Sequence, residues 1–338
     1  MVMLLYKDKW TDFVAELARR NLQVPVEDQG VIKFATLPES PAPALEHCNT
    51  TVPPKAHLFP QTETLYRFQP GNIKVETPSL EEESVLLGVR PCDARAISIV
   101  ERLFGGEIDD PYFRRRRELV TLVGVACREP GINCFCTSVG GGPASTEGLD
   151  LLLVDLGESY YLQAVTGKGE ALLEATRHLL QKAPEEAVNR KEQLVNQSAE
   201  KIRRSIDLRG IPEGLPTLWE DPLWRDTAAA CLGCGICTYL CPTCHCFDIQ
   251  DELEGRQGRR YRNWDSCMFS EYSLHASKHN PRPTRRERTR NRINHKYNYF
   301  VQKFGVIACV GCGRCINLCP VNIDLLEVLG LVKEALRK

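Results

Sequence analysis

Two short cysteine-rich runs with identical spacing constrain this sequence more than any other feature. Both follow the pattern C-x2-C-x2-C-x3-C-P, one from Cys231 to Pro242 and the other from Cys309 to Pro320. Bacterial two-cluster ferredoxins bind [4Fe–4S] clusters with this run, because three thiolates spaced three residues apart let one tight loop hold three corners of a cubane. A zinc ribbon would instead show two separated C-x2-C pairs without the final C-P. The sequence therefore predicts two [4Fe–4S] clusters.

The fourth cysteine of each run is expected to bind the cluster of the other run. In two-cluster ferredoxins this cysteine reaches across to the second cluster, so the ligand sets are interleaved. The predicted ligands are Cys231, Cys234, Cys237 and Cys319 for cluster one, and Cys309, Cys312, Cys315 and Cys241 for cluster two.

The remaining composition fits a globular intracellular metalloprotein. Sixteen cysteines in 338 residues, mostly at short spacings, indicate metal or redox chemistry more than disulfides. The formal net charge of −1 argues against a nucleic-acid-binding field over the whole molecule. No apolar run approaches the roughly 18 residues of a membrane span, and the first ten residues lack a signal-peptide pattern. We therefore expect a cytoplasmic protein with no membrane span and no nucleic-acid partner.

Apolar, β-rich runs alternate with helical patterns in the N-terminal half. The predicted strands cover 84–89, 119–126 and 149–156, and the predicted helices cover 10–20 and 93–104. Asp93 stands where the N-cap of the second helix is expected. Strands that alternate with helices predict an α/β arrangement.

These patterns divide the chain into three parts within an α+β fold class. An N-terminal α/β domain is predicted over 1–165, and a helical segment and linker over 166–224, in which prolines mark 210–224 as the linker. A dicluster ferredoxin-like domain is predicted over 225–338, with an insertion at 247–303. The predicted fold is thus an α/β domain followed by a bacterial-type two-[4Fe–4S] ferredoxin domain.

Further cysteines follow the predicted strands and suggest a third metal site. Adjacent strands deliver their loops to one edge of a sheet, so thiols after them converge, and we predict a third [4Fe–4S] cluster bound by Cys92, Cys127, Cys134 and Cys136. The alternatives are buried, inert cysteines and a site built from Cys244, Cys246 and Cys267 with a histidine. Cys244 and Cys246 are interpreted as packing or hydrogen-bond neighbours of cluster two, and Cys48 as unligated.

The insertion carries a concentrated positive charge. Between residues 278 and 303 the sequence has nine Lys or Arg and one acid, Glu287. A nucleic-acid surface and an ordinary solvated surface are both alternatives. Our preferred interpretation is that these cations face anionic clusters or an acidic partner, which would raise the cluster potential.

Several motifs together resemble one protein family. They occupy residues 88–95, 127–141, 241–249 and 275–283, and the resemblance extends over most of 84–325. These segments resemble the iron–sulfur beta subunit of cytosolic NiFe sulfhydrogenases and the related iron–sulfur subunit of anaerobic sulfite reductase. The resemblance implies an electron-transfer protein without a substrate site of its own. Such a protein connects a flavin-containing, NAD(P)-binding partner to a catalytic subunit of hydrogenase, sulfite reductase or heterodisulfide-reductase type.

The leading functional hypothesis is therefore an electron-relay subunit of a multi-subunit oxidoreductase in an anaerobe. We identify no catalytic triad, carboxylate pair or nucleotide-binding loop in the sequence. One alternative is a self-contained iron–sulfur reductase with a substrate or flavin site in the N-terminal domain. A second alternative is an iron–sulfur sensor that binds DNA through the basic insertion.

Overall fold

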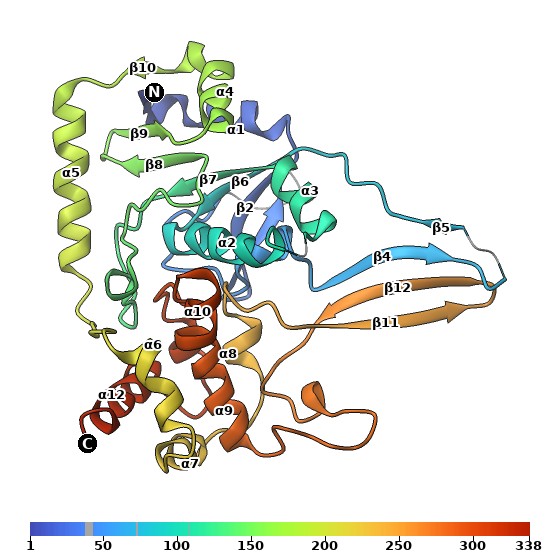
Figure 1. Ribbon diagram of the computed structural model, residues 1–338. Helices are drawn as coiled ribbons and strands as arrows, with labels where there is room; N and C mark the ends of the chain where they lie inside the picture. The colour runs from blue at the N-terminus through green and yellow to red at the C-terminus, as the bar shows by residue number, and fades with distance from the viewer. Residues whose placement is uncertain (38–42, 72–73, 108) are drawn as a thin grey trace.

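A mixed eight-stranded sheet organises the N-terminal half of the molecule. The computed structural model describes residues 1–37, 43–71, 74–107 and 109–338. The strand order is β10-β1-β9-β8-β7-β6-β2-β3, and the neighbours β2, β6, β7 and β8 run parallel (Figure 1). The strands are β1 (Val2–Tyr6), β2 (Leu22–Asp28), β3 (Val31–Thr36), β6 (Ser84–Val89), β7 (Val120–Val125), β8 (Leu151–Asp155), β9 (Ser159–Ala164) and β10 (Gln181–Lys182).

Helices cover both faces of this sheet, which explains why its central strands are apolar throughout. On one face Leu86, Leu122 and Leu152 are completely buried in the core that includes α2 and α3. On the other face Val85 and Leu153 share a core with α1 and α4. The helices are α1 (Trp10–Ala18), α2 (Pro91–Phe104), α3 (Pro111–Leu119), α4 (Gly167–Ala175) and α5 (Glu185–Glu200).

The predicted strands and helices of this half are confirmed, with one correction. Strand β6 has the predicted bounds, and β7 and β8 begin and end within two residues of theirs. The N-cap prediction for Asp93 is wrong, because Arg90 holds that position and Pro91 begins α2. The Asp93 carboxylate is instead buried in an ion pair with Arg314, 2.6 Å away.

Short helices build the core of the C-terminal half. The residues predicted as a linker at 210–224 fold instead into α6, η5 and the start of α7, because their apolar side chains are needed in this core. Leu215 and Trp224 are fully buried there with Leu329. The elements are α6 (Ile211–Gly214), η5 (Leu215–Leu218), α7 (Leu223–Ala228), α8 (Ile236–Tyr239), α11 (Arg314–Asn317) and α12 (Leu325–Ala335).

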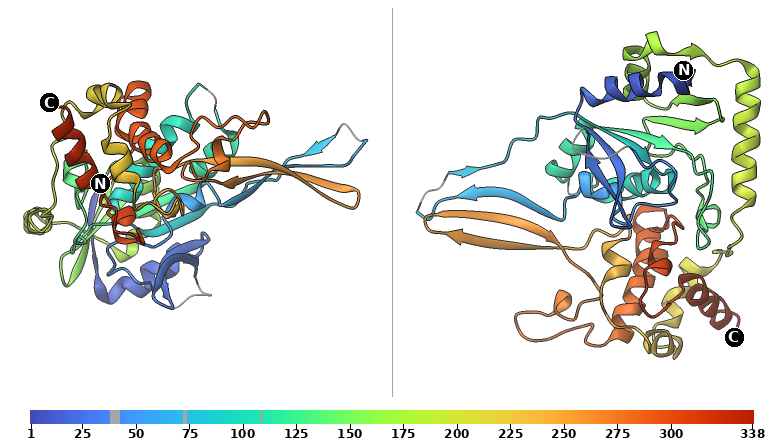
Figure 2. Two further views of the ribbon diagram at one scale, coloured as in Figure 1. Left: turned by 90° about the horizontal axis from the view of Figure 1, so that it is seen from below. Right: turned by 180° about the vertical axis from the view of Figure 1, so that it is seen from behind.

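The insertion forms a long hairpin that joins strands from the N-terminal half. Strand β11 (Phe247–Glu254) pairs with β12 (Gln257–Trp264), and β12 pairs with β4 (Thr62–Phe68), which pairs with β5 (Val75–Glu76). This four-stranded sheet projects from the body as an arm (Figures 1 and 2). The buried Arg262 of β12 is held by the carboxylates of Glu63 and Asp110. The halves of the chain are thus joined by backbone pairing and ion pairs.

After the arm, a helical segment returns to the body and carries the basic residues. It comprises α9 (Arg285–Asn294), the π-helix η7 (His295–Tyr299) and α10 (Phe300–Phe304). Thr284 and Glu287 form a capping box that starts α9. The remaining short helices are η1 (Lys7–Lys9), η2 (Pro54–His57), η3 (Cys136–Val139), η4 (Arg177–Leu179) and η6 (Glu271–Ser273). Among the helices that the structure describes, none has the length and hydropathy that a bilayer span requires. The domain boundaries at 165 and 224 stay predictions.

Candidate metal centres

The two cysteine runs fold into the same local turn. In each run the glycine two residues before the third cysteine caps the N-terminus of a short helix, and the backbone of this glycine is in the left-handed region. Gly235 has φ +78° before α8, and Gly313 has φ +76° before α11. A side chain would be strained at that angle, and a Cβ on Gly235 would lie 2.8 Å from the Phe269 ring. The repeated spacing of the sequence is therefore a repeated backbone structure.

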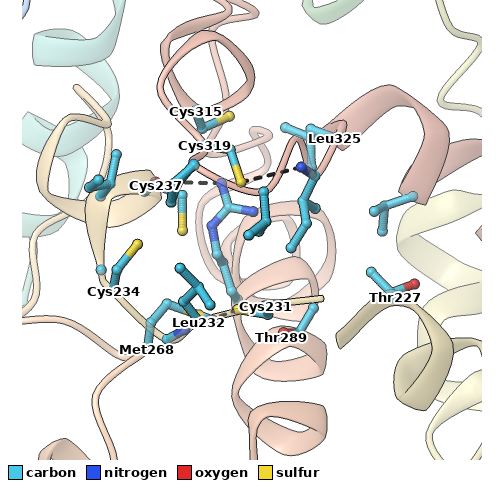
Figure 3. A pocket seen from close by; sticks show the side chains of 18 of the residues that line it. Thr227, Cys231, Leu232, Cys234, Cys237, Met268, Thr289, Cys315, Cys319 and Leu325 are labelled. Carbon is cyan, nitrogen blue, oxygen red and sulfur yellow. Dashed lines mark hydrogen bonds between the residues drawn. The ribbon is translucent and has the colours of Figure 1, made fainter. Parts of the chain in front are cut away.

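The first cavity is lined by cysteines from both runs. Cys231 and Cys234 come from the loop before α8, Cys237 lies in α8, and Cys319 follows α11 and faces them across the cavity (Figure 3). Backbone N–H groups point at two of the sulfurs: Gly233 donates to Cys231 Sγ at 3.4 Å, and Ile323 donates to Cys319 Sγ at 3.2 Å. The cysteines that line the first cavity are the four predicted ligands of cluster one, Cys231, Cys234, Cys237 and Cys319, together with Cys315 of the second run.

The second cavity is lined by the complementary four cysteines and is more deeply buried. Cys309 and Cys312 are buried, whereas Cys234 of the first cavity is exposed to solvent. The two cavities share Cys315 and Arg292 in their walls, so they lie side by side. The four cysteines are Cys241, Cys309, Cys312 and Cys315.

Burial disfavours the ionised form of these thiols when no metal is bound. Burial raises the pKa of Cys312 to about 11 and that of Cys315 to about 12. Near neutral pH both side chains are therefore neutral thiols until a metal takes the place of the proton. No three of the described metal-binding side chains stand close enough to share a single ion. The thiols instead line cavities, which suits a cluster in which each thiolate binds a different iron.

Buried cations surround the second cavity. Lys296 is 2% exposed, and its Nζ lies 3.2 Å from Cys241 Sγ. Burial alone would lower the pKa of the Lys296 amine. The nearby Cys241 and Cys244 sulfurs have the larger combined effect, so the pKa of the amine is raised. Arg292 and Lys55 also face these sulfurs. In the part of the chain that the structure describes, no carboxylate pairs with Lys296, Arg292 or Lys55.

Such buried charges are costly without a counter-charge. A thiolate-ligated cluster supplies that counter-charge, so the donors and the cations both fit an anionic cluster. The basic segment thus contains two kinds of cation: Arg292 and Lys296 face the cysteines, whereas Arg286 and Arg290 pair with Glu220. Part of the basic segment therefore faces the cluster-binding cysteines, and part of it forms ion pairs elsewhere.

The third cavity brings the four predicted N-terminal cysteines together with a fifth, Cys48. Cys92 lies in the first turn of α2, Cys127 follows β7, and the other two lie in the loop beyond it. Cys48 Sγ lies 3.7 Å from Cys134 Sγ and accepts a hydrogen bond from the Gly131 N–H at 3.1 Å. The cysteines that line this cavity are Cys48, Cys92, Cys127, Cys134 and Cys136 from the N-terminal half, together with Cys312 of the second run.

The third cavity adjoins the second through closely packed backbone. Gly311 and Cys312 line the third cavity, and Cys312 also lines the second. The Phe135 N–H donates to the Gly311 carbonyl at 2.8 Å, and a Cβ on Gly311 would lie 2.6 Å from the Cys136 nitrogen. The three cavities therefore form a row, with the second in the middle.

The remaining three cysteines take two different roles. The neighbouring Cys244 thiol lowers the pKa of Cys241, which agrees with the interpretation of Cys244 as a hydrogen-bond neighbour of cluster two. The pKa of Cys246 is lowered chiefly by Cys267, and Cys246 packs against the buried group of Cys231, Cys267 and Met268. His245 packs on the ring of His295, with ring centroids 5.3 Å apart.

Comparisons with known proteins agree with this arrangement. Residues 230–323 match the family model of the 4Fe-4S dicluster domain, so the C-terminal part is an iron–sulfur domain of the two-cluster class. Sulfhydrogenase 2 subunit beta of Pyrococcus furiosus is 31% identical over 313 residues, which cover 92% of this chain and 92% of that protein. The chain belongs to the family of iron–sulfur beta subunits of sulfhydrogenases, an electron-transfer family, and the resemblance found in the sequence is confirmed.

Proposed function

We propose that this chain relays electrons inside a cytoplasmic hetero-oligomeric enzyme of an anaerobe. It would connect a flavin- and NAD(P)-binding subunit to a catalytic redox subunit of hydrogenase, sulfite reductase or heterodisulfide-reductase type. The similarity to a sulfhydrogenase subunit favours the hydrogenase type. All sixteen cysteines are free thiols, which suits a reducing compartment.

Each cavity is proposed to hold one [4Fe–4S] cluster, which carries a single electron. The interleaved cysteines would hold clusters one and two in the first and second cavities. Cys92, Cys127, Cys134 and Cys136 would hold a third cluster, with Cys48 as a hydrogen-bond neighbour of Cys134. The buried cations would stabilise the negative charge of cluster two, and the surrounding backbone would restrain the ligands.

The observation that carries this proposal is the row of three cysteine-lined cavities with shared walls. Cys315 belongs to the first and second cavities, and Cys312 to the second and third. Centres held by adjoining walls are close enough to exchange electrons in sequence. Because such a row has two ends, it suits a protein that passes electrons between two partners better than a single isolated redox site would.

Exposed apolar side chains lie near both ends of the row. At the first cavity Cys234 is exposed and its neighbour Leu232 is 61% exposed. At the third cavity the loop that carries Cys134 also carries Ile132, which is 86% exposed. Exposed apolar side chains at both ends are suitable contacts for two different subunits.

Metal analysis of the anaerobically purified chain tests the proposal. We expect about twelve irons and twelve acid-labile sulfides per chain for three cubanes, without flavin. Rapid reduction of all centres by a reduced flavoprotein partner should follow. A chain that binds zinc in place of iron would contradict the relay, and about eight irons would contradict the third cluster alone.

A second candidate function is a self-contained reductase, which one crevice favours. It lies beside Cys48 at the carboxyl ends of β6 and β7, where parallel sheets commonly bind ligands. Arg90, Arg128 and Tyr160 contribute to its lining. Stoichiometric flavin in the purified chain would favour this candidate over the relay.

A further inference from the structure

Cys246 and Cys267 form a thiol pair outside the three cysteine-lined cavities. Cys246 and Tyr272 pack against the buried group that contains Cys267, and the Cys267 thiol, the Cys267 backbone N–H and the Tyr272 hydroxyl together lower the pKa of Cys246. Cys267 is 9% exposed. Neither cysteine lines any of the three cavities. The two sulfurs are therefore partners of each other.

The base of the arm fixes this pair in place. Cys246 directly precedes β11, and Cys267 follows β12 by three residues. Phe247 pairs with Trp264 in the ladder, and the next residue, Asp265, donates its N–H to the Cys246 carbonyl at 2.9 Å. The Trp264 indole N–H is bound to the Phe59 carbonyl at 3.0 Å. Because both flanking strands are anchored, the sulfurs are held together although 20 residues separate them in the chain.

The pair packs against the first cavity. Cys267 belongs to one buried group with Cys231 and Met268, and Cys237 and Cys246 pack against that group. Cys231 and Cys237 are proposed ligands of cluster one. A thiol pair in this position is close enough to exchange electrons with the cluster.

We propose that Cys246 and Cys267 are a redox-active dithiol that stores two electrons beside cluster one. This inference rests on the proposed electron-relay function. On oxidation, a bond forms between the two Sγ atoms and both thiol protons leave. The two electrons pass one at a time to two oxidised [4Fe–4S] clusters, each of which gains one. On reduction, the disulfide takes back two electrons from reduced clusters and two protons from solvent.

The groups around Cys246 suit this chemistry. The Tyr272 hydroxyl and the Cys267 N–H stabilise negative charge on Cys246 Sγ, which is the charge that a thiolate carries when a disulfide forms or opens. The pair would convert single-electron centres into a unit that handles two electrons and two protons. A partner that donates or accepts hydride matches such a unit.

A reductive titration of the iron-loaded chain tests the dithiol. Oxidised protein is titrated anaerobically with dithionite, and electrons taken up are compared with iron content. We expect the wild type to take up two more electrons per chain than Cys246→Ser or Cys267→Ser, at equal iron content, since a disulfide is a two-electron couple. Ser270→Ala, in the same turn, is the matched control and should retain the wild-type count. In oxidised wild type, alkylation under denaturing conditions followed by mass spectrometry should recover a peptide pair joined through Cys246 and Cys267.

Two results would overturn the dithiol. Equal electron counts in wild type and both variants at equal iron content would show that the pair is redox-inactive. Loss of about four irons in Cys246→Ser and Cys267→Ser alike would show that the pair binds a cluster. An iron-free wild-type chain would instead refute the proposed function itself, so the two failures are distinguishable.

Discussion

Lys296 offers the sharpest test of how the protein tunes cluster two. The residue is 2% exposed, and its ammonium group lies 3.2 Å from Cys241 Sγ and also donates to Thr243 Oγ1 and the Ala308 carbonyl. A fixed positive charge so close to a ligand favours the reduced, more negative cluster. Lys296→Met removes the charge while it retains much of the side-chain volume. We therefore expect the midpoint potential of cluster two to fall.

The size of the fall follows from Coulomb's law. At an effective dielectric constant of about 20, unit charges 3.2 Å apart interact by about 5 kcal/mol, which is an upper bound because the added electron lies beyond the sulfur. At about 6 Å the same expression gives about 3 kcal/mol. Since 59 mV corresponds to a tenfold change for a one-electron centre, we expect a fall of about 100 to 200 mV.

Redox titration followed by EPR spectroscopy measures this shift. Lys296→Arg keeps the charge and should move the potential much less than Lys296→Met. Lys303→Met, on the exposed side of α10, is the matched control for removal of a lysine and should leave the potential unchanged. A shift below about 20 mV in Lys296→Met, with iron content intact, would refute the electrostatic argument.

Three further predictions concern the ligands and the buried ion pair. Cys319→Ser should remove the same EPR signal as Cys234→Ser although the two residues are far apart in the chain, and loss of different signals would contradict the interleaved assignment. Cys127→Ser should lower the iron content from about twelve to about eight per chain by colorimetric assay, and unchanged iron would contradict a third cluster bound there. Arg314→Met strands the buried Asp93 carboxylate and should lower the free energy of unfolding by about 3 to 5 kcal/mol in denaturant titration, whereas Arg260→Met in an exposed pair should change it far less.

Strands β6, β7 and β8 and helices α1 and α2 were predictable because they depend on local pattern, whereas β1, β2, β3 and β9 of the same sheet were not predicted. Strand β6 is a continuous apolar run bounded by polar residues, and burial on both faces is what that run requires. Asp93 shows the limit of local reasoning. Its position before a helical pattern fits a cap, but its actual partner, Arg314, lies 221 residues further along the chain. Contacts over such a distance leave no mark in the local sequence.

In the candidate site, too, local sequence patterns predict some of the residues and not others. The grouping of the ferredoxin-type cysteines follows from spacing, and the convergence of Cys92 and Cys127 follows from strands that end at one edge of a sheet. Cys48 lies outside the regular elements, so no periodicity marks it. The pairing of Cys246 with Cys267 depends on the hairpin, for which the opposed charges of Glu252 and Arg259 were an available signal.

The walls of the three cavities also share one segment of the chain. Each cavity includes a residue from the segment 309–319: Cys319 in the first, Cys309 in the second and Gly311 in the third. A chain that lacks this segment would have no complete wall for any of the three cavities, so all three proposed clusters are expected to depend on one short stretch of the polypeptide.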